Sequence, residues 1–338
     1  MPMQLLVTGG AGFIGSNFIR YWLQTHPDDT IRNFDALTYA GNAGSLADLV
    51  SDPRYVLIKG DITDAAAVEQ AMTGVDIVVH LAAESHVDRS VLEPAAFVRT
   101  NVLGTQVLLD AARAAKVKRF HHVSTDEVFG SLELGSSERF SEMTAYAPHS
   151  PYSASKAGSD MLVRAYHDTY GLPVTISNCS NNYGPYQFPE KLIPLMVINA
   201  LAGKKLPVYG RGENVRDWVH VLDHNRAVAA IIERGTVGET YCIGGNSERT
   251  NLTIVTSILK LLGKSEELIE YVTDRPGHDL RYAVDGGKIE RELGFRPEFV
   301  FEDGLADTVR WYVENRSWWE PIISGEYAGY YATQYGSR

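Results

Sequence analysis

The stretch Leu5-Leu6-Val7-Thr8-Gly9-Gly10-Ala11-Gly12-Phe13-Ile14-Gly15 decides the fold of this chain of 338 residues. An apolar run of strand character leads into three glycines with the spacing G-x-x-G-x-x-G, and an amphipathic segment follows. Glycine here permits a tight turn, lets the backbone approach a pyrophosphate and lets the helix pack on the strand. The start of the helix offers N–H groups to phosphate. The pattern predicts a strand–turn–helix unit that binds a dinucleotide.

Asp35 supports this prediction because it stands 20 residues after Gly15, at the expected end of the second strand. A carboxylate at this distance binds the adenosine ribose hydroxyls and repels a 2′-phosphate. We therefore expect NAD as the cofactor rather than NADP. The alternative, a structural turn with a capping Asp, explains less of the pattern.

Two further segments are expected to contact the cofactor. Asp61-Ile62 follows the third strand and is expected to face the adenine, although a helix-capping role explains Asp61 equally well. The run Leu81-Ala82-Ala83-Glu84-Ser85 follows the fourth strand, where small side chains allow the backbone close to the cofactor.

The first half of the chain alternates short apolar runs with amphipathic segments. We expect strands at residues 4–7, 31–34, 55–58, 77–81, 120–124 and 174–178, and helices at 14–23, 65–72, 102–115 and 152–170. This alternation predicts an α/β fold with a Rossmann-type, doubly wound parallel sheet. After about residue 180 glycine and proline become frequent, which predicts a smaller mixed α/β lobe.

The predicted boundary divides an NAD-binding Rossmann domain, residues 1–178, from a mainly substrate-binding lobe, residues 179–338, with the chain free to cross between them. The aromatic tail from Tyr327 is expected to pack against the rest of the protein.

Composition argues against several classes of protein. Acidic residues outnumber basic ones, 42 to 31, and no Lys/Arg run stands out, which disfavours nucleic-acid and membrane-surface partners. Cys179 and Cys242 are too few for a disulfide scaffold or a cysteine-built zinc site, and His86 and His278 lack metal-ligand spacing. Without a leader pattern or an apolar stretch of membrane-spanning length, we expect a cytoplasmic protein with no metal.

Tyr152 and Lys156 are the candidate catalytic pair. Ser150 and Pro151 mark a helix start, and the four-residue spacing puts both side chains on one face. A phenol with a pKa near ~10 is a poor base. Lowering that pKa by about three units, through Lys156 and a positive nicotinamide, takes roughly 4 kcal/mol. The Y-x-x-x-K spacing alone is common on helix surfaces, but behind a dinucleotide site with Ser124-Thr125 upstream it indicates redox chemistry.

Taken together, these motifs resemble the extended short-chain dehydrogenase/reductases and, within them, the dTDP-glucose 4,6-dehydratase family. The resemblance runs nearly end to end, through residues 37–42, 82–90, 124–128, 179–186, 214–218 and 274–278. It implies that NAD oxidises carbon 4 of dTDP-glucose, that water leaves across carbons 5 and 6, and that carbon 6 is reduced again.

Asp126-Glu127 is the discriminating pair. The resemblance assigns Asp126 as the acid for the leaving hydroxyl and Glu127 as the base for the carbon-5 proton, with Thr125, Tyr152 and Lys156 completing the catalytic set. Consecutive strand residues point to opposite faces, so both carboxyls reach one sugar only from a loop after the strand. An isolated Asp-Glu would be interpreted as a solvated turn.

The resemblance also implies further contacts. The expected cofactor site comprises Gly9, Gly12, Phe13, Ile14, Gly15, Asp35, Leu37, Thr38, Asp61, Ile62, Leu81, Ala82, Ala83, Ser85, Thr100, Tyr152, Lys156 and Asn182. The expected substrate site comprises Ser85, Thr125, Asn181, Lys191, Leu192, Pro207, Tyr209, Arg216, Asn251, Asp274, Arg275 and His278. Arg216 is expected to hold a phosphate bidentately, whereas a helix cap explains Asn251 equally well.

One departure from the family pattern is visible. Phe129 stands where the family more often has Tyr, which removes a hydroxyl contact and affects the expected positioning of the sugar.

Two other enzymes and one non-enzyme are the alternatives. A UDP-hexose 4-epimerase or a UDP-glucuronate decarboxylase would share the cofactor and the Tyr152/Lys156 pair. An epimerase needs no acid–base pair at carbons 5 and 6, and decarboxylase-like sequences carry Ser or Thr before the Glu. An NAD-sensing scaffold would not need the intact catalytic set.

A homodimer is the last expectation. The segments 102–115 and 161–170 are more apolar than one sheet face requires, and the resemblance implies that they pair into a four-helix bundle.

Overall fold

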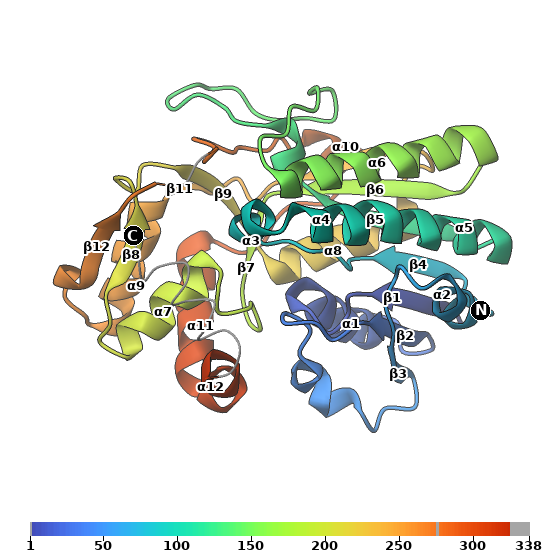
Figure 1. Cartoon of the computed structure of the whole chain (residues 1–338), viewed down its shortest axis with the longest axis horizontal. Coiled ribbons are helices and arrows are strands. Elements are labelled where there is room, and N and C mark those ends of the chain that lie inside the picture. Colours follow the sequence, from blue (N-terminus) through green and yellow to red (C-terminus); the bar gives the residue numbers. More distant parts are fainter. Residues whose placement is uncertain (1, 275–276, 325–338) are drawn as a thin grey trace.

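A seven-stranded parallel sheet organises the larger half of the molecule (Figure 1). The computed structural model describes residues 2–274 and 277–324. The strand order reverses between β1 (Gln4–Thr8) and β4 (Ile77–His80). The loops that follow these two strands therefore run in opposite directions and leave a crevice at the carboxyl edge of the sheet. In spatial order the strands are β10 (Thr240–Ile243), β6 (Val174–Cys179), β5 (Arg119–Thr125), β4 (Ile77–His80), β1 (Gln4–Thr8), β2 (Thr30–Asp35) and β3 (Tyr55–Lys59).

Helices cover both faces of this sheet. Leu5 and Val7 of β1 join the core beneath one helical layer, whereas Leu6 joins the core beneath the other, as strand alternation requires. Both sides of each strand are therefore buried, and the strands are continuous apolar runs. One layer holds α1 (Phe13–Thr25), α8 (Val221–Arg234) and α10 (Gly287–Leu293), and the other holds α2 (Ala65–Met72), α5 (Thr105–Ala115) and α6 (Pro151–Tyr170).

The expected helix at residues 102–115 is not continuous. It begins as a π-helical segment, Val98–Gly104, and becomes α-helical only in α5. Two short helices, α3 (Val87–Leu92) and α4 (Pro94–Phe97), lead into it, and 3₁₀ helices occupy Ala43–Leu49 and Asp126–Phe129.

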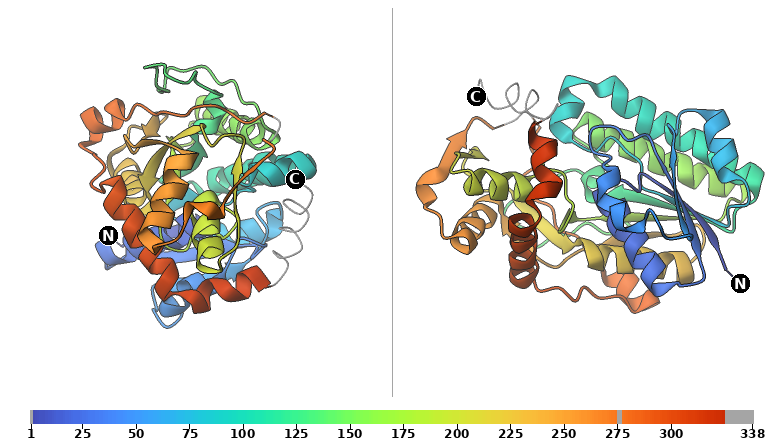
Figure 2. Two further views of the ribbon diagram at one scale, coloured as in Figure 1. Left: turned by 90° about the vertical axis from the view of Figure 1, so that its left-hand side faces the viewer. Right: turned by 90° about the horizontal axis from the view of Figure 1, so that it is seen from below.

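The second half is smaller and mixed, as predicted (Figure 2). Its apolar core gathers side chains of α7, α9 and α11. Its elements are β7 (Asn181–Tyr183), β9 (Val215–His220) and β11 (Glu248–Thr250) in one sheet, β8 (Leu206–Tyr209) and β12 (Ile269–Val272) in another, α7 (Leu192–Leu201), α9 (Asn251–Leu262), α11 (Phe301–Glu314), α12 (Arg316–Ser324) and a 3₁₀ turn, Glu266–Leu268.

The chain crosses back to the large sheet after residue 178. The strand β10 was not predicted, because a buried run of four residues among many glycines gives no periodicity to identify it. It pairs with β6, while α8 and α10 pack on the same half. The tail from Tyr327, which we expected to pack, lies outside the described residues. Within the described part of the chain, every helix is too short or too polar to span a bilayer.

The boundaries of α6 follow the predicted start and stop residues. The Ser150 hydroxyl accepts the Ser153 N–H at 3.0 Å and Ser153 bonds back to Ser150, which forms a capping box. Gly171 ends the helix in the left-handed conformation, with φ of 68°.

Replacing Gly245 tests how closely the backbone is packed at the junction between the two halves. It lies between β10 and β11, and a Cβ there would stand 1.8 Å from the backbone oxygen of Trp218. We expect Gly245→Ala to lower the free energy of unfolding by about 2–3 kcal/mol, because the backbone must move to relieve the overlap. Urea unfolding measures this loss. Gly286→Ala, whose Cβ would meet nothing nearer than 3.9 Å, is the control and should cost less than about 0.5 kcal/mol; equal losses would contradict the packing argument.

Candidate active site

One cavity of about 320 Å³ lies at the carboxyl edge of the large sheet. It brings together residues from both predicted sites and the whole catalytic set. Of the residues predicted for the cofactor, substrate and catalytic sites, those that line it are Gly9, Gly12, Phe13, Ile14, Gly15, Asp35, Thr38, Asp61, Ile62, Leu81, Ala82, Ala83, Ser85, Thr100, Thr125, Asp126, Glu127, Tyr152, Lys156, Asn181, Asn182 and Lys191.

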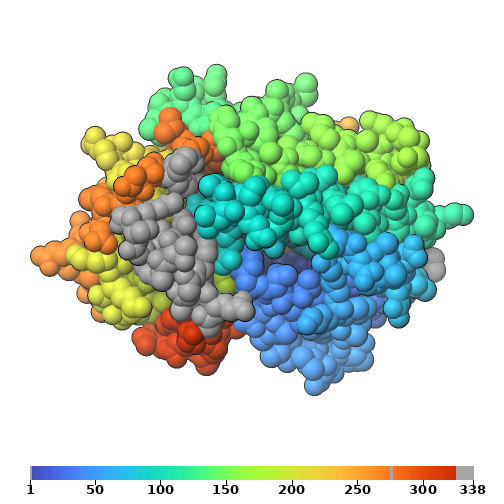
Figure 3. All heavy atoms as spheres, viewed as in Figure 1, coloured from blue at the N-terminus to red at the C-terminus, as the bar shows by residue number. Residues whose placement is uncertain are grey.

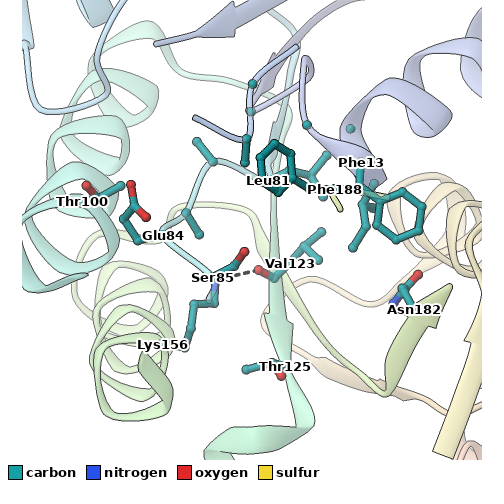
Figure 4. A pocket seen from close by; sticks show the side chains of 18 of the residues that line it. Phe13, Leu81, Glu84, Ser85, Thr100, Val123, Thr125, Lys156, Asn182 and Phe188 are labelled. Carbon is teal, nitrogen blue, oxygen red and sulfur yellow. Dashed lines mark hydrogen bonds between the residues drawn. The ribbon is translucent and has the colours of Figure 1, made fainter. Parts of the chain in front are cut away.

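The cavity has two distinct ends (Figure 4). Phe13, Leu81 and Phe188 lie toward the glycine turn. Thr125 and Lys156 lie at the opposite end, where β5 and α6 meet. A ligand that filled the cavity would therefore extend from the glycine turn to the catalytic side chains.

The glycine turn has the shape that a dinucleotide pyrophosphate needs. Gly9 has φ of 70°, and a Cβ on it would stand 2.6 Å from the backbone of Ala82. A Cβ on Gly15 would stand 2.3 Å from the Gly9 oxygen. Gly12 caps α1 without any side-chain hydrogen bond, and no acidic residue occupies the first turn, so the N-terminal N–H groups face the cavity without competition from a side-chain cap.

Asp35 is held at the rim by two backbone amides. Its Oδ2 accepts the N–H of Ala11 at 2.9 Å, and its Oδ1 accepts the N–H of Leu37 at 2.8 Å. Burial raises the pKa of Asp35, and the two amide hydrogen bonds oppose that rise. Leu37 itself does not line the cavity; with φ of 53° it turns the chain so that its amide reaches the carboxylate. These residues fit the adenosine ribose of NAD.

Two alternative capping roles are wrong. Asp64, not Asp61, caps α2 by accepting the N–H groups of Ala66 and Ala67, while Asp61 accepts the N–H of Thr63 in the preceding turn. Thr250 caps α9, which makes Asn251 the first residue inside that helix. In both helices the true cap, Asp64 or Thr250, is the residue just before the first turn, and its backbone is still extended.

The catalytic residues meet where β5 ends. Thr125 is the last residue of the strand, and a 3₁₀ turn follows at once, so Asp126 and Glu127 both lie past the strand, as expected. The Thr125 hydroxyl accepts the Glu127 N–H at 3.3 Å. On α6, the Lys156 ammonium donates to the backbone oxygen of Val123 at 2.8 Å (Figure 4).

The two carboxyl groups have different environments. Asp126 is only 1% exposed, whereas Glu127 is partly exposed. Burial first, and then the negative charges of Glu127 and Asp217, raise the pKa of Asp126 well above its ordinary value. Both effects favour the protonated form of Asp126, which is the state a general acid requires.

The expected lowering of the Tyr152 pKa does not arise from the chain alone. Burial and the charge of Glu127 raise the pKa of Tyr152 well above its ordinary value, and burial lowers the pKa of Lys156. The prediction combined Lys156 with a bound nicotinamide, so for the protein with its cofactor it stays a prediction. The positive nicotinamide ring is the remaining source of a lowered pKa.

The rest of the predicted substrate site lies outside this cavity, in the second half. Lys191 links the two regions by donating to the Ser85 backbone oxygen at 2.8 Å, and the Tyr209 hydroxyl reaches Asp88 at 3.1 Å. The residues that do not line the cavity are Leu192, Pro207, Tyr209, Arg216, Asn251, Asp274 and His278, and Arg275 lies outside the described residues.

Arg216 is buried and already bound to protein groups. Its guanidinium donates to the backbone oxygens of Val215 and Asp279 and lies 4.1 Å from the ring centre of Tyr282. His278 and Asp274 form an ion pair of 2.6 Å, and the His278 ring contacts Tyr209 edge-on.

Sequence reasoning missed several residues that line or support the cavity. Gln187, Phe188 and Glu190 line it, and Glu190 pairs with Arg89 at 2.9 Å. These three residues follow directly after the run at 179–186, but their types and spacing match no binding motif that would have marked them as cavity residues. Phe129 does not line the cavity: it packs against Phe140 and Tyr146, so the expected effect on sugar contacts has no direct basis here. Among the described residues no cluster of three or more His, Cys, Asp or Glu could hold a metal.

Comparison with known proteins agrees with this geometry. The family model described as GDP-mannose 4,6 dehydratase matches residues 6–308. A dTDP-glucose 4,6-dehydratase of Shigella flexneri is 52% identical, over 99% of this chain and 100% of the relative. The crystal structure of DesIV, a dTDP-glucose 4,6-dehydratase from Streptomyces venezuelae with NAD and TYD bound, is 56% identical with a TM-score of 0.92, over 95% of this chain and 100% of that one.

An epimerase shares the fold at greater distance. The UDP-glucose 4-epimerase of Thermus thermophilus, in complex with NAD, is 28% identical with a TM-score of 0.84, over 93% of this chain and 100% of that one. Since about half of its residues match the dehydratases over nearly its whole length, the chain belongs to the dTDP-glucose 4,6-dehydratase family.

Proposed function

We propose that this protein is an NAD-dependent hydro-lyase that converts dTDP-glucose into dTDP-4-keto-6-deoxyglucose and water. The observation that carries the proposal is the pair Asp126 and Glu127 in one cavity with Tyr152 and Lys156. A protonated carboxyl beside a more exposed one supplies the acid and the base that an elimination needs.

Each catalytic side chain has one task. Tyr152 accepts the proton of the 4-hydroxyl, and Lys156 supplies positive charge beside it. NAD, held by the glycine turn and Asp35, would supply a hydride acceptor for carbon 4 and the hydride donor for carbon 6. Glu127 takes the carbon-5 proton, which the 4-ketone has made acidic, and Asp126 protonates the departing 6-hydroxyl, which leaves as water. When hydride adds to carbon 6, Glu127 returns its proton to carbon 5, and the proton taken up by Tyr152 balances the one that Asp126 gave, through exchange with solvent. There is no net redox change, so the cofactor need not leave between turnovers.

Substrate recognition is assigned to the second lobe, residues 179–338. Asn181 and Lys191 line the cavity, and Arg216, Tyr209 and His278 belong to the same lobe without lining it. These groups suit a nucleoside diphosphate, because arginine and lysine neutralise phosphate while amides and a phenol bind a base. A cytoplasmic location suits such a substrate.

The epimerase alternative shares the fold and the Tyr152/Lys156 pair. It gives no role to a buried, protonated Asp126, and burying a carboxyl without a task costs stability. Incubation with dTDP-glucose separates the two functions. A 4-keto sugar, detected by its absorbance in alkali, supports the dehydratase, whereas conversion of UDP-glucose to UDP-galactose without that absorbance would favour the epimerase.

Replacing Asp126 tests the elimination step. Asp126→Asn keeps the size of the side chain but cannot give a proton to the leaving hydroxyl, so product formation should fall by about two to four powers of ten. Oxidation at carbon 4 should survive, which stopped-flow absorbance of reduced nicotinamide would follow. Glu127→Gln is the matched variant and should instead slow exchange of the carbon-5 proton with deuterated water. Near-normal turnover of Asp126→Asn would mean that the pair is structural.

Replacing Asp35 tests cofactor choice. Asp35→Asn removes the charge that repels a 2′-phosphate while keeping one acceptor for the Ala11 and Leu37 amides. Turnover with NADP relative to NAD should rise about tenfold, equivalent to roughly 1.4 kcal/mol. Apo-protein reconstituted with each cofactor gives the ratio, and equal activity of the unaltered protein with both cofactors would overturn the role of Asp35.

Met161 tests the proposed homodimer. Val98, Leu103 and Met161 are 56%, 47% and 50% exposed, on the helical band around α4, α5 and α6 that crosses one face of the molecule (Figure 3). We expect a dimer at micromolar concentration, and Met161→Lys should weaken it at least about tenfold because a charge would be buried. Light scattering measures both. Met143→Lys, at a loop position that is 92% exposed, should leave the mass unchanged. A monomeric unaltered protein would refute the proposal.

A further inference from the structure

A fully buried carboxylate lies directly behind the catalytic pair. Asp160 stands four residues after Lys156 on α6, so the two side chains share a face of the helix. Both are buried, and the same strand, β5, contacts each of them. Lys156 donates to the oxygen of Val123, and the hydroxyl of the next residue, Ser124, donates to Asp160 at 2.8 Å.

Donors converge on Asp160 from several elements. The Tyr146 hydroxyl donates at 2.8 Å from the loop before α6, and the Asn178 amide donates at 3.3 Å from β6. His122 Nε2 lies 3.1 Å from the other carboxylate oxygen. Burial acts to raise the pKa of Asp160, but the neighbouring His122, the charge of Lys156 and the Ser124 hydroxyl hold it below its ordinary value.

The buried charge of Asp160 requires a cation nearby. His122 is close enough, but burial and the nearby Lys156 lower the pKa of His122 to about 4, so its ring is neutral at pH 7. The side chain of Arg164 bonds to the Tyr146 hydroxyl rather than to Asp160. Lys156, one turn earlier on α6 and bonded to the adjacent Val123 backbone, is then the cation whose charge acts on Asp160.

The other titratable groups around the pair do not replace Asp160. Burial raises the pKa of Asp126, which favours its neutral form, and burial raises the pKa of the Cys179 thiol to about 12. Burial also raises the pKa values of Tyr146 and Tyr152, which leaves both phenols neutral in the protein alone. Asp160 is the charged group that opposes the loss of the proton from buried Lys156.

We propose that Asp160 is a positioning residue whose buried negative charge keeps Lys156 in its positive form beside Tyr152. A lysine that loses its proton in a dry site cannot favour the phenolate, so the base of the oxidation step would fail. Asp160 does not line the cavity, so in this proposal it acts only through Lys156. This inference rests on the proposed roles of Tyr152 and Lys156.

The first test is a pH titration of the Lys156 ammonium by NMR, in NAD-loaded protein without sugar and with lysine labelled with heavy nitrogen. Loss of the signal in Lys156→Arg assigns it. We expect Lys156 to be positive at pH 7 in the unaltered protein, and to lose its proton about one pH unit or more lower in Asp160→Asn, because an attractive charge is gone. A neutral Lys156 in the unaltered protein would overturn the proposal even if Asp160→Asn failed to fold.

The second test uses the pH profile of turnover. In Asp160→Asn the acid limb of kcat should move to higher pH, with about tenfold less activity at neutral pH and little change in KM. In the Lys156→Arg background the same substitution should not move the limb, because a guanidinium keeps its charge without a counter-ion. If Asp160→Asn moved the acid limb equally with Lys156 and in the Lys156→Arg background, the role of Asp160 would be structural only.

Tyr146→Phe is the matched control, because it removes one hydrogen bond to the same carboxylate and leaves the charge in place. The Lys156 titration should then stay within about half a pH unit of normal, and a full-size shift would overturn the charge argument. The NMR readout needs no turnover. The two proposals can therefore fail separately. Absence of a 4-keto product would count against the proposed function, whereas the NMR titration would still test the role of Asp160.

Discussion

Exclusion of water from the carboxyl edge of the large sheet is the constraint on which the site depends. The same desolvation acts on each titratable group according to its sign: it keeps Asp126 protonated, opposes ionisation of Tyr152, and lowers the proton affinity of Lys156. The first effect helps an acid, whereas the other two hinder a base. Hydroxyl and amide donors surround the buried carboxylate of Asp160 and stabilise its negative charge, which in turn favours the positive form of Lys156. A bound NAD would add a further positive charge near Tyr152. Acid and base chemistry can thus operate a few residues apart in one dry cavity.

Much of this arrangement could be predicted from the sequence, because the informative residues are those with strict backbone requirements. Gly9 and Gly15 leave no room for a side chain, and Ser150 with Gly171 bounds the helix that carries the catalytic pair. Residues that matter through their surroundings could not be found this way. Asp160 has no distinctive spacing, and its importance appears only when β5, β6 and a distant loop bring donors to it. The effect of burial on the pKa of Tyr152 in the protein without cofactor could not be predicted for the same reason, since a motif does not reveal how deeply its side chains are buried.

The second half shows the limit of periodicity most clearly. The predicted glycine- and proline-rich lobe exists, but β10 inside it belongs to the other half of the molecule. Its four residues, all buried, form a run that fits a strand or a piece of a helix equally well. Similarly, the family resemblance implied Arg216 as a phosphate ligand, yet its guanidinium also binds the backbone oxygen of Asp279 and so links β9 to that segment.

The position of β10 also governs how the protein must fold. Thr240 pairs with Ile176, 64 positions earlier, and the intervening chain builds much of the second lobe, including β7, β8, β9 and α7. Parallel pairing over such a separation is slow, since the loop must close before any contact compensates for its entropy. During synthesis, the outer edge of β6 therefore stays open until residue 243 has left the ribosome. A fragment that ended at residue 178 would expose that edge permanently and would be prone to pair with other strands.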